Sequence, residues 1–400
     1  MNKTIKDISL EIGSGITPLR SNELYWNSPD IPWIKTEQLG QYRIFDSTEY
    51  ISNFALEDTN IRLWSPHTVS VAMYGEGKTR GNASILMIET TTNQACCNIK
   101  VNDALADYRF LYYWLKNNYE NLRTLSAGVR NNLNADDIKS FPFPENSLPE
   151  QEKIADILSV VDDKIELNSK ICSELETMAK TLYGYWFMQF DFPDENGKPY
   201  RTSGGEMEWN EQLKREIPKG WEVTNIGKIT ANFDSRRIPL SQNERNSMKG
   251  DIPYYGATGV MDYVDRFIFD GQYVLIAEDG SVMDSDGYPI VQMIWGKAWV
   301  NNHAHVLEGH NGYSNELLYF VLKDIPVIKI MTGSIQKKIN QDNLNNYKIP
   351  QIPHKIANRF TSILKPIFSK LRAVEIENSE LTKLRDWLLP MLMNGQARVE

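Results

Sequence analysis

The strongest constraint on the fold is an internal repeat. Residues 134–182 align without gaps onto residues 340–388, a shift of 206 positions. Upstream of these segments the two halves align more loosely, with small gaps. A repeat of this length predicts a duplicated fold in which both halves contain the same elements. The clearest matches are Asp136 with Asp342, Ile138 with Leu344, Phe141 with Tyr347 and Pro144 with Pro350.

Each half begins with a mixed segment and continues into a helix-patterned segment. Short β-patterned runs at 85–88, 273–277 and 298–307 are bounded by Gly, Asn and Asp, and helix-like stretches lie at 107–118 and 314–323. We predict an α+β fold in which two pseudo-repeated mixed α/β domains are separated by two long helices. The expected segments are a first domain 1–147, a helix 148–186, a connecting segment 187–220, a second domain 221–350 and a helix 351–394.

Both helix-patterned segments carry a heptad seam, because seam positions recur at alternating spacings of three and four. The seams are Leu158, Val161, Ile165, Asn168, Cys172, Leu175, Ala179 and Leu182, and then Leu364, Ile367, Leu371, Val374, Asn378, Leu381, Arg385 and Leu388. We expect the two helices to pack as an antiparallel coiled coil. The alternative is two amphipathic helices that pack on separate cores.

In the antiparallel pairing, residues whose numbers sum to 546 face each other, which places Asn168 and Asn378 in one layer. Two facing amides can satisfy each other and fix the register of the helices. Pro366 lies inside the second seam and is expected to kink or begin that helix.

The run VAMYGEGKTRG at 71–81 is similar to a phosphate-binding loop, with Lys78 and Thr79 at the expected positions and Ala72 in place of a Gly. The residues that follow Gly81 are turn residues and then a β-patterned stretch, so the sequence predicts no helix N-terminus to receive a phosphate. The repeat also aligns 69–75 with 274–280, where the second half has a different turn. A nucleotide hydrolase is therefore the less favoured alternative.

Composition narrows the class of protein. The formal net charge of −9 argues against indiscriminate nucleic-acid binding, although a local basic face remains compatible with it. Three cysteines, Cys96, Cys97 and Cys172, fit neither a zinc spacing nor a disulfide framework. The N-terminus lacks a signal-peptide core, and no apolar run is long enough to span a bilayer. We expect a cytoplasmic protein without a membrane partner.

The order of motifs resembles the DNA-specificity subunit of Type I restriction-modification systems over essentially the whole chain. The run from 149 to 221 carries the most specific part of the resemblance, whereas the mixed domains would be variable target-recognition domains. The motifs, in order, are LPEQEKIA from 148, FDFP from 190, GKPY from 197, SGG from 203 and IPKGW from 217.

The resemblance implies a non-catalytic subunit that binds a bipartite double-stranded DNA sequence, one half-site per domain. It implies two adenine methyltransferase subunits that bring S-adenosylmethionine, and endonuclease subunits that translocate DNA with ATP and Mg. No cofactor or metal is expected in this chain. A specificity subunit of a methylation-only system is the alternative within the same architecture.

DNA readout requires Arg, Lys, Asn, Gln and small polar side chains near base edges and phosphates. The most informative pair is GVRNN at 128–132 with GSIQKK at 333–338, because both lie at the same point of the repeat. The candidates in the first domain are Arg20, Tyr74, Lys78, Thr79, Arg80, Arg130, Asn131 and Asn132. Those in the second are Arg236, Arg237, Tyr255, Ser281, Gln336, Lys337 and Lys338.

Other polar groups have simpler interpretations. Glu278 and Asp279 could accept from a cytosine amino group, but without a basic neighbour in the sequence they are equally suited to a structural role. The pair Asp162 and Asp163 is expected on the solvated face of its helix. If 299–307 is one strand, His303 and His305 share a face, yet packing or hydrogen-bonding roles are favoured over a metal site.

Overall fold

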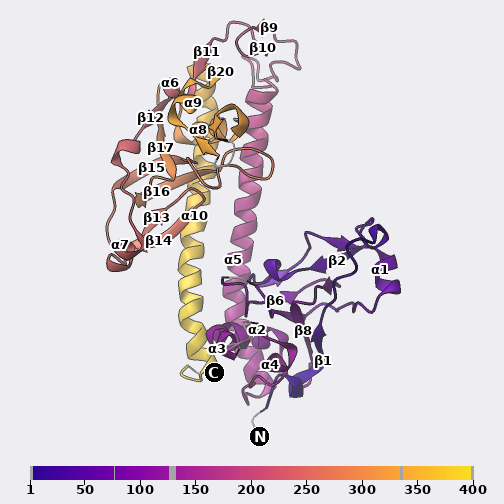
Figure 1. Cartoon of the computed structure of the whole chain (residues 1–400). Helices are drawn as coiled ribbons and strands as arrows, with labels where there is room; N and C mark the ends of the chain where they lie inside the picture. Colours follow the sequence, from indigo (N-terminus) through magenta and orange to yellow (C-terminus); the bar gives the residue numbers. More distant parts are fainter. Residues whose placement is uncertain (1–2, 76, 126–131, 334–336, 398–400) are drawn as a thin grey trace. The chain divides into compact units, whose positions relative to one another are not determined.

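A computed structural model describes residues 3–75, 77–125, 132–333 and 337–397. Two compact units make up the fold. Unit 1 contains Met1–Ser169 and Glu375–Glu400, and unit 2 contains Lys170–Val374. The division falls inside the two long helices α5 (Leu148–Tyr183) and α10 (His354–Met393), so each unit contains part of each helix (Figure 1).

Unit 1 is built on a five-stranded sheet with the order β1-β8-β5-β6-β3, in which all neighbours are antiparallel except β6 and β3. A second sheet has the order β4-β2-β7. The strands are β1 (Ser9–Ser14), β2 (Ile31–Ile34), β3 (Arg43–Ile44), β4 (Tyr50–Ile51), β5 (Thr68–Ala72), β6 (Ala83–Leu86), β7 (Thr91–Thr92) and β8 (Cys96–Val101).

Helix α2 (Tyr108–Asn117) packs on this sheet, and Asp107 caps it by accepting from the backbone of Arg109 and Phe110. Buried aromatic residues on α2, among them Phe110 and Tyr112, belong to the core. Shorter helices are α1 (Asn53–Asp58), α3 (Tyr119–Leu125) and α4 (Ala135–Lys139), with 3-10 turns η1 (Lys6–Ile8), η2 (Glu23–Tyr25) and η3 (Thr36–Gln38).

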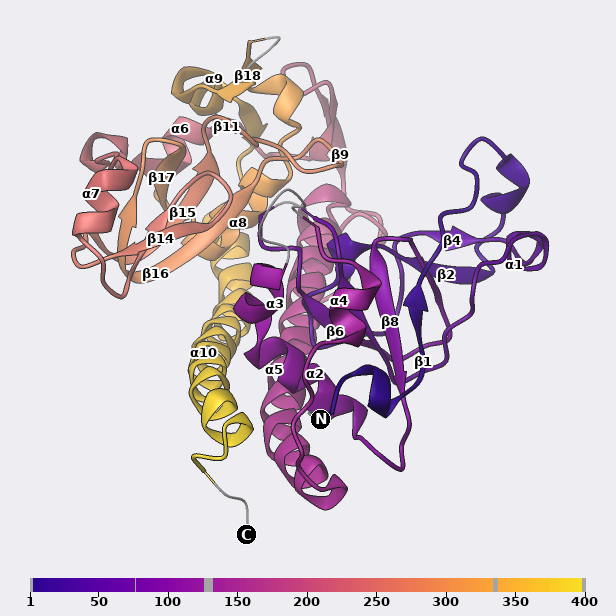
Figure 2. The same ribbon diagram turned by 60° about the horizontal axis from the view of Figure 1, so that its bottom comes forward.

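Unit 2 contains a six-stranded sheet with the order β12-β17-β15-β16-β13-β14, part of which faces the viewer in Figure 2. The strands are β12 (Thr230–Asn232), β13 (Ile252–Tyr255), β14 (Val260–Val264), β15 (Phe269–Ala277), β16 (Val291–Val300) and β17 (Ala304–Gly309). Three short pairs join β9 (Met207–Asn210) to β10 (Arg215–Pro218), β11 (Val223–Asn225) to β20 (Lys348–Pro350), and β18 (Met331–Thr332) to β19 (Lys338–Ile339).

Helix α8 (Asn315–Lys323) packs on this sheet as α2 does in unit 1, which confirms both predicted helix stretches. The remaining helices are α6 (Ile226–Ile229), α7 (Gln242–Ser247) and α9 (Gln341–Asn346), with 3-10 turns η5 (Asp234–Arg236) and η6 (Val327–Lys329) and a π-helical turn η4 (Gly184–Met188) that extends α5. The connecting segment is ordered, because Phe192 stacks between Tyr200 and Trp221.

The two long helices pair as predicted. In unit 1 the Asn168 side chain is 1% exposed, and its Nδ2 donates to Asn378 Oδ1 at 2.8 Å and to Glu377 Oε2 at 2.9 Å. In unit 2, Cys172 and Leu175 of α5 pack on the core that contains Leu371 of α10. The shared asparagine layer confirms the antiparallel register.

Helix α10 begins at His354, so Pro366 lies inside the helix and does not begin it, while the alternative of a kink stays a prediction. Two expectations about these elements were wrong. The run 298–307 is not one strand, because β16 ends at Val300 and a turn precedes β17. Asp162 is not solvated, since it is 3% exposed.

The buried carboxylate of Asp162 is compensated within unit 1. Arg385 donates from Nη1 to Asp162 Oδ1 at 2.7 Å, and the Tyr113 hydroxyl donates to Oδ2 at 2.8 Å. Burial and the Asp162 charge raise the pKa of Tyr113, so its hydroxyl stays a donor. Asp163 is half exposed and pairs with Arg43. A side-chain network therefore ties α2 to both long helices.

None of the helices in the described part of the chain is long and apolar enough to cross a membrane. All three cysteines are free thiols, and burial raises the pKa of Cys96 and of Cys97 to about 12. These two thiols therefore stay protonated at neutral pH.

Removing the arginine of the buried network should destabilise the chain strongly. Arg385→Ala leaves the Asp162 carboxylate buried without a cation, which costs about 3–5 kcal/mol of unfolding free energy. Urea denaturation measures this cost. The exposed Lys383→Ala on the same helix is the control, and the cost of Arg385→Ala should shrink in an Asp162→Asn background. Equal costs in both backgrounds would contradict a coupled pair.

Candidate nucleic-acid interface

In unit 1 the turn that follows β5 is exposed, and side chains of helix α3 hydrogen-bond to its backbone. Lys78 projects into solvent and Tyr74 is 39% exposed. Helix α3 supports the backbone, because Tyr119 donates to the Lys78 carbonyl at 2.6 Å and Arg123 donates to the Gly77 carbonyl at 3.0 Å. Backbone carbonyls of the turn face the helix, and the exposed side chain of Lys78 stays available to a ligand.

The turn lies beside the residue that directly follows the candidate loop 128–132. Leu133, directly after that loop, donates its backbone N–H to the Met73 carbonyl at 3.1 Å. Asn132 is exposed, whereas Arg130 and Asn131 lie outside the described residues. Thr79 and Arg80 are half-buried in the same turn, and Arg80 has further contacts inside the protein. The structure thus brings most of the unit 1 candidates into one region.

Arg20 belongs to a different local cluster. Its guanidinium pairs with Glu49 at 2.6 Å and lies 3.7 Å from the Trp26 ring centroid and 4.7 Å from that of Trp33. A cation held between a carboxylate and two indole faces is already well satisfied. These contacts give Arg20 a packing role beside the three-stranded sheet.

Unit 2 repeats the same arrangement at the end of β15. Ile339 donates its backbone N–H to the Glu278 carbonyl at 2.8 Å, as Leu133 does to Met73 in unit 1. Ser281 in the turn is exposed, and Lys337 precedes β19. Gln336 lies outside the described residues. The pairing of the two Gly-led loops, which the repeat predicted, is therefore confirmed at their C-terminal ends.

The remaining unit 2 candidates are largely engaged within the fold. Arg236 is exposed but lies over the Phe269 ring and donates to the Ile268 carbonyl at 2.6 Å. Tyr255 is half-buried in β13 beside the sheet core. Arg237 is 13% exposed and pairs with Glu278 at 2.6 Å, while Lys338 pairs with the same carboxylate at 2.8 Å. Arg237 and Lys338 thus neutralise a buried acid.

Glu278 has no basic neighbour in the sequence but two in the fold, which supports the structural role. Its carboxylate is 12% exposed and receives Arg237 on one oxygen and Lys338 on the other. Burial opposes its charge, but the hydrogen bonds from Lys338 and Arg237 outweigh burial and lower the pKa of Glu278. These partners come from distant parts of the sequence, so sequence spacing held no signal for them.

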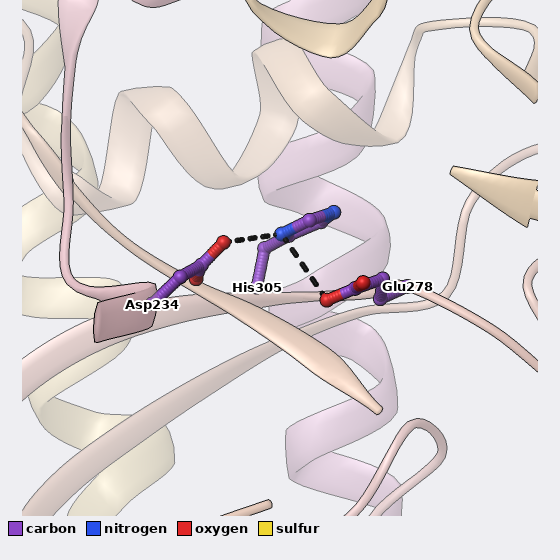
Figure 3. A group of neighbouring side chains, drawn as sticks. All are labelled: Asp234, Glu278 and His305. Atoms are coloured by element: carbon purple, nitrogen blue, oxygen red, sulfur yellow. Dashed lines mark hydrogen bonds and ion pairs between the residues drawn. The ribbon is translucent and has the colours of Figure 1, made fainter. Parts of the chain in front are cut away.

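His305 completes this charged cluster, as Figure 3 shows. Its ring is 3% exposed, with Nδ1 at 2.5 Å from Asp234 Oδ2 and 3.6 Å from Glu278 Oε2. Burial disfavours the charged ring, but the hydrogen bond and charge of Asp234 outweigh burial, so the pKa of His305 is raised. His303 does not share its face, since it is 47% exposed and pairs with Asp279.

Asp234, Glu278 and His305 offer the donor types of a metal site. The space between them, however, already contains cations. Arg237 reaches Glu278 at 2.6 Å and Asp234 at 3.4 Å, and Lys338 takes the other oxygen of Glu278. A divalent ion would have to displace two bonded cations from the same carboxylates. The cluster is therefore a charge-compensated brace, and the predicted preference for hydrogen-bonding histidines holds for His305.

The brace predicts an acid-sensitive contribution to stability. Because the pKa of Glu278 is lowered in the folded chain, its contribution is present above the unfolded value of about 4.3 and is lost as the pH falls through the folded value. Glu278→Gln should lower the unfolding free energy by about 2–3 kcal/mol near neutral pH. It should also make the unfolding free energy fall less steeply as the pH is lowered. Urea denaturation at a series of pH values measures both effects, and the exposed Glu308→Gln is the control. An unfolding free energy that falls equally steeply at acid pH in Glu278→Gln and in the unchanged chain would contradict this role of Glu278.

Comparison with known proteins places this geometry in a family. The model of the Type I restriction modification DNA specificity domain matches residues 1–177 and again 218–383. The MjaIX specificity subunit of Methanocaldococcus jannaschii is 29% identical over 100% of this chain and 93% of its own length. The HindI specificity subunit of Haemophilus influenzae is 22% identical over 79% of this chain and 84% of its own.

The fold agrees with these relatives. The crystal structure of the Type I restriction-modification S subunit from M. genitalium superposes with a TM-score of 0.57 at 20% identity, over 98% of this chain and 95% of that one. Subunits of this kind recognise DNA and have no catalytic activity of their own. With the family model matched twice, once in each half of the repeat, the chain belongs to the DNA-specificity subunits of Type I restriction-modification systems.

Proposed function

We propose that the chain binds a bipartite double-stranded DNA sequence in the cytoplasm and that each unit reads one half-site. The observation that carries this proposal is the repeated backbone hydrogen bond, from Leu133 to Met73 in unit 1 and from Ile339 to Glu278 in unit 2. Each bond joins a polar loop to the turn that follows a buried central strand. Two equivalent loop-and-turn pairs in one chain suit a ligand with two separate recognition elements.

The exposed side chains at these positions have the chemistry of DNA contacts. Lys78 and Tyr74 in unit 1 are free to reach a phosphate or a base edge, and Asn132 can read a base through its amide. In unit 2, Ser281 is exposed in the turn after β15, and the half-buried Lys337 directly precedes β19. Arg20, Arg237 and Lys338 are bonded internally, and we assign them to positioning these surfaces.

The partners follow from the family. We propose that two adenine methyltransferase subunits join the chain and bring S-adenosylmethionine, and that the endonuclease subunits bring ATP and Mg. This chain would direct them to the target and contribute no cofactor of its own. The same chain would also serve a methylation-only complex, in which the endonuclease subunits are missing.

Exposed apolar side chains on the unit 1 parts of the long helices fit a protein partner. Val160 and Leu167 are seven residues apart on α5 and are 67% and 54% exposed. Ile376 and Trp387 are eleven residues apart on α10 and are 51% and 59% exposed. These spacings place each pair on one line of its helix. Such stripes mark interaction surfaces, and we assign them to the methyltransferase.

Selection of duplexes from a randomised library with the full-length chain, bound to the methyltransferase subunits of its own system, tests DNA recognition. We expect two short conserved blocks separated by a gap of fixed length. Lys78→Ala should reduce the slope of log affinity against log salt by about 1, because one phosphate contact is lost. Lys6→Ala, an exposed lysine in the same unit, should leave the slope unchanged.

One uninterrupted block, or a slope that Lys78→Ala does not alter, would contradict this assignment. The rival nucleotide hydrolase needs a helix after the GEGKT run, whereas the chain enters β6 there, as predicted. Tight ATP binding that is abolished by Lys78→Ala would nevertheless support that rival.

The partner surface has its own test. Trp387→Ala should weaken binding of the methyltransferase subunit about tenfold or more, because exposed tryptophans at interfaces contribute strongly to affinity. Isothermal titration calorimetry gives the affinity, and the melting temperature should not change because the side chain is exposed. Lys383→Ala is the matched control on the same helix. Unaltered binding by Trp387→Ala would remove this surface from the interface.

A further inference from the structure

We propose that His305 is a positioning residue for the second half-site, because its ring, hydrogen-bonded at both nitrogens, lies among the three segments that carry the candidate residues of unit 2. This inference rests on the proposed function and adds a proton-dependent element that unit 1 lacks. The three segments are η5 with Arg237, the turn 278–281, and the residues 337–339 around β19.

Both ring nitrogens of His305 face hydrogen-bond acceptors. Nδ1 lies 2.5 Å from a carboxylate oxygen of Asp234, and Nε2 lies 2.9 Å from the Ile339 carbonyl oxygen. A backbone carbonyl cannot donate, so Nε2 must carry a hydrogen. Burial opposes the charge of Asp234, but the bond from His305 outweighs it and lowers the pKa of Asp234, so Nδ1 must donate as well. Only the protonated ring satisfies both contacts.

The two bonds join segments that are distant in the sequence. Asp234 begins η5, and its second oxygen accepts from the Val306 backbone at 2.8 Å. Ile339 ends β19, directly after Lys337 and Lys338. Glu278, 3.6 Å from the ring, begins the turn after β15. One buried side chain of β17 thus contacts a residue in each of the three segments.

Among the described residues, Asp234 and Glu278 carry the charges that act on the ring, and their own ion-pair partners and neighbours complete the balance. Asp234 and Arg237 come from η5 and the residue after it, Glu278 and Asp279 from the turn, Lys338 from β19, and His303 from the turn before β17. Loss of the ring proton leaves either Asp234 or the Ile339 carbonyl facing a nitrogen lone pair. The segment that loses this bond is then held less firmly against β17, although Asp234 keeps its bond from the Val306 backbone.

In unit 1 the position equivalent to His305 holds an uncharged residue. The strand registers pair Ile276 with His305 in unit 2 and Val71 with Cys97 in unit 1, so Cys97 occupies the position of His305. By the same strand registers, Met73 is equivalent to Glu278 and Ser14 to Asp234. Continued without a gap, the second alignment makes Thr17 equivalent to Arg237. Cys97 and Met73 are 0% and 2% exposed. The first half-site therefore serves as an internal control for pH.

The test uses the full-length chain with its methyltransferase subunits and the duplex recovered from the library, with each half scrambled in turn. Between roughly pH 6 and 9, where lysines stay charged, affinity for the second half-site should fall as the pH rises, whereas affinity for the first stays level. His305→Gln should weaken the second half-site about tenfold at pH 6.5 and remove its pH dependence. His303→Gln is the exposed control.

A variant that carries the unit 1 residues at the equivalent positions of unit 2 tests whether weak binding by His305→Gln reflects misfolding. Asp234→Ser, Arg237→Thr, Glu278→Met and His305→Cys together should restore binding of the second half-site and make it independent of pH. NMR titration of the His305 ring without DNA should show it protonated well above the ordinary histidine value of about 6.5.

Two results would overturn the assignment of His305. One is a ring that titrates at or below the ordinary value, and the other is an identical pH profile for both half-sites. If no duplex is selected over a scrambled one, the proposed DNA function fails instead, and the NMR titration alone then decides whether His305 is protonated in its brace.

Discussion

The pairing of α5 with α10 is the constraint on which both units depend. The core of unit 1 contains Leu158 from α5 together with Leu389 and Leu392 from α10. The core of unit 2 likewise contains Tyr183 from α5 and Leu364 from α10. Neither core is complete without a helix from the other half of the sequence, so the asparagine layer that sets the register also sets the composition of both cores.

The duplicated scaffold tolerates opposite chemistry at equivalent positions. Asp162, with Arg385 and Tyr113, forms a buried polar network in unit 1, while the positions 206 residues away hold Phe368 and Ala179. Phe368 packs on Phe320 with ring centroids 6.0 Å apart. At the His305 cluster the charged residues lie in unit 2 instead, and the equivalent residues of unit 1 are uncharged. Backbone geometry is shared, and the side chains that stabilise it are not.

The sequence predicted the features that follow from periodicity and repetition. The two long helices, their antiparallel register, α2, α8 and the pairing of the two Gly-led loops all follow from spacing within one chain. Periodicity did not reveal that Asp162 is buried, because the burial depends on α2 packing over α5. The turn between β16 and β17 was missed because its short polar run interrupts an otherwise β-patterned stretch.

The charged brace around Glu278 lay beyond sequence reasoning for a related reason. Asp234, Glu278, His305 and Lys338 belong to four separate elements, and their proximity depends on strand order in the sheet. Strand order is a tertiary property that no local pattern encodes. The assignment of individual side chains to DNA stays a prediction at every candidate position.

The residues that directly follow the two loops, Leu133 and Ile339, are anchored through their backbones at the Met73 carbonyl in one unit and the Glu278 carbonyl in the other. A peptide N–H is present at every residue type except proline, so this anchor persists while the side chains beside it change. Substitutions within the loops can then alter which bases are preferred without rebuilding the domain. Such a separation of anchor from readout lets new sequence preferences arise in small mutational steps.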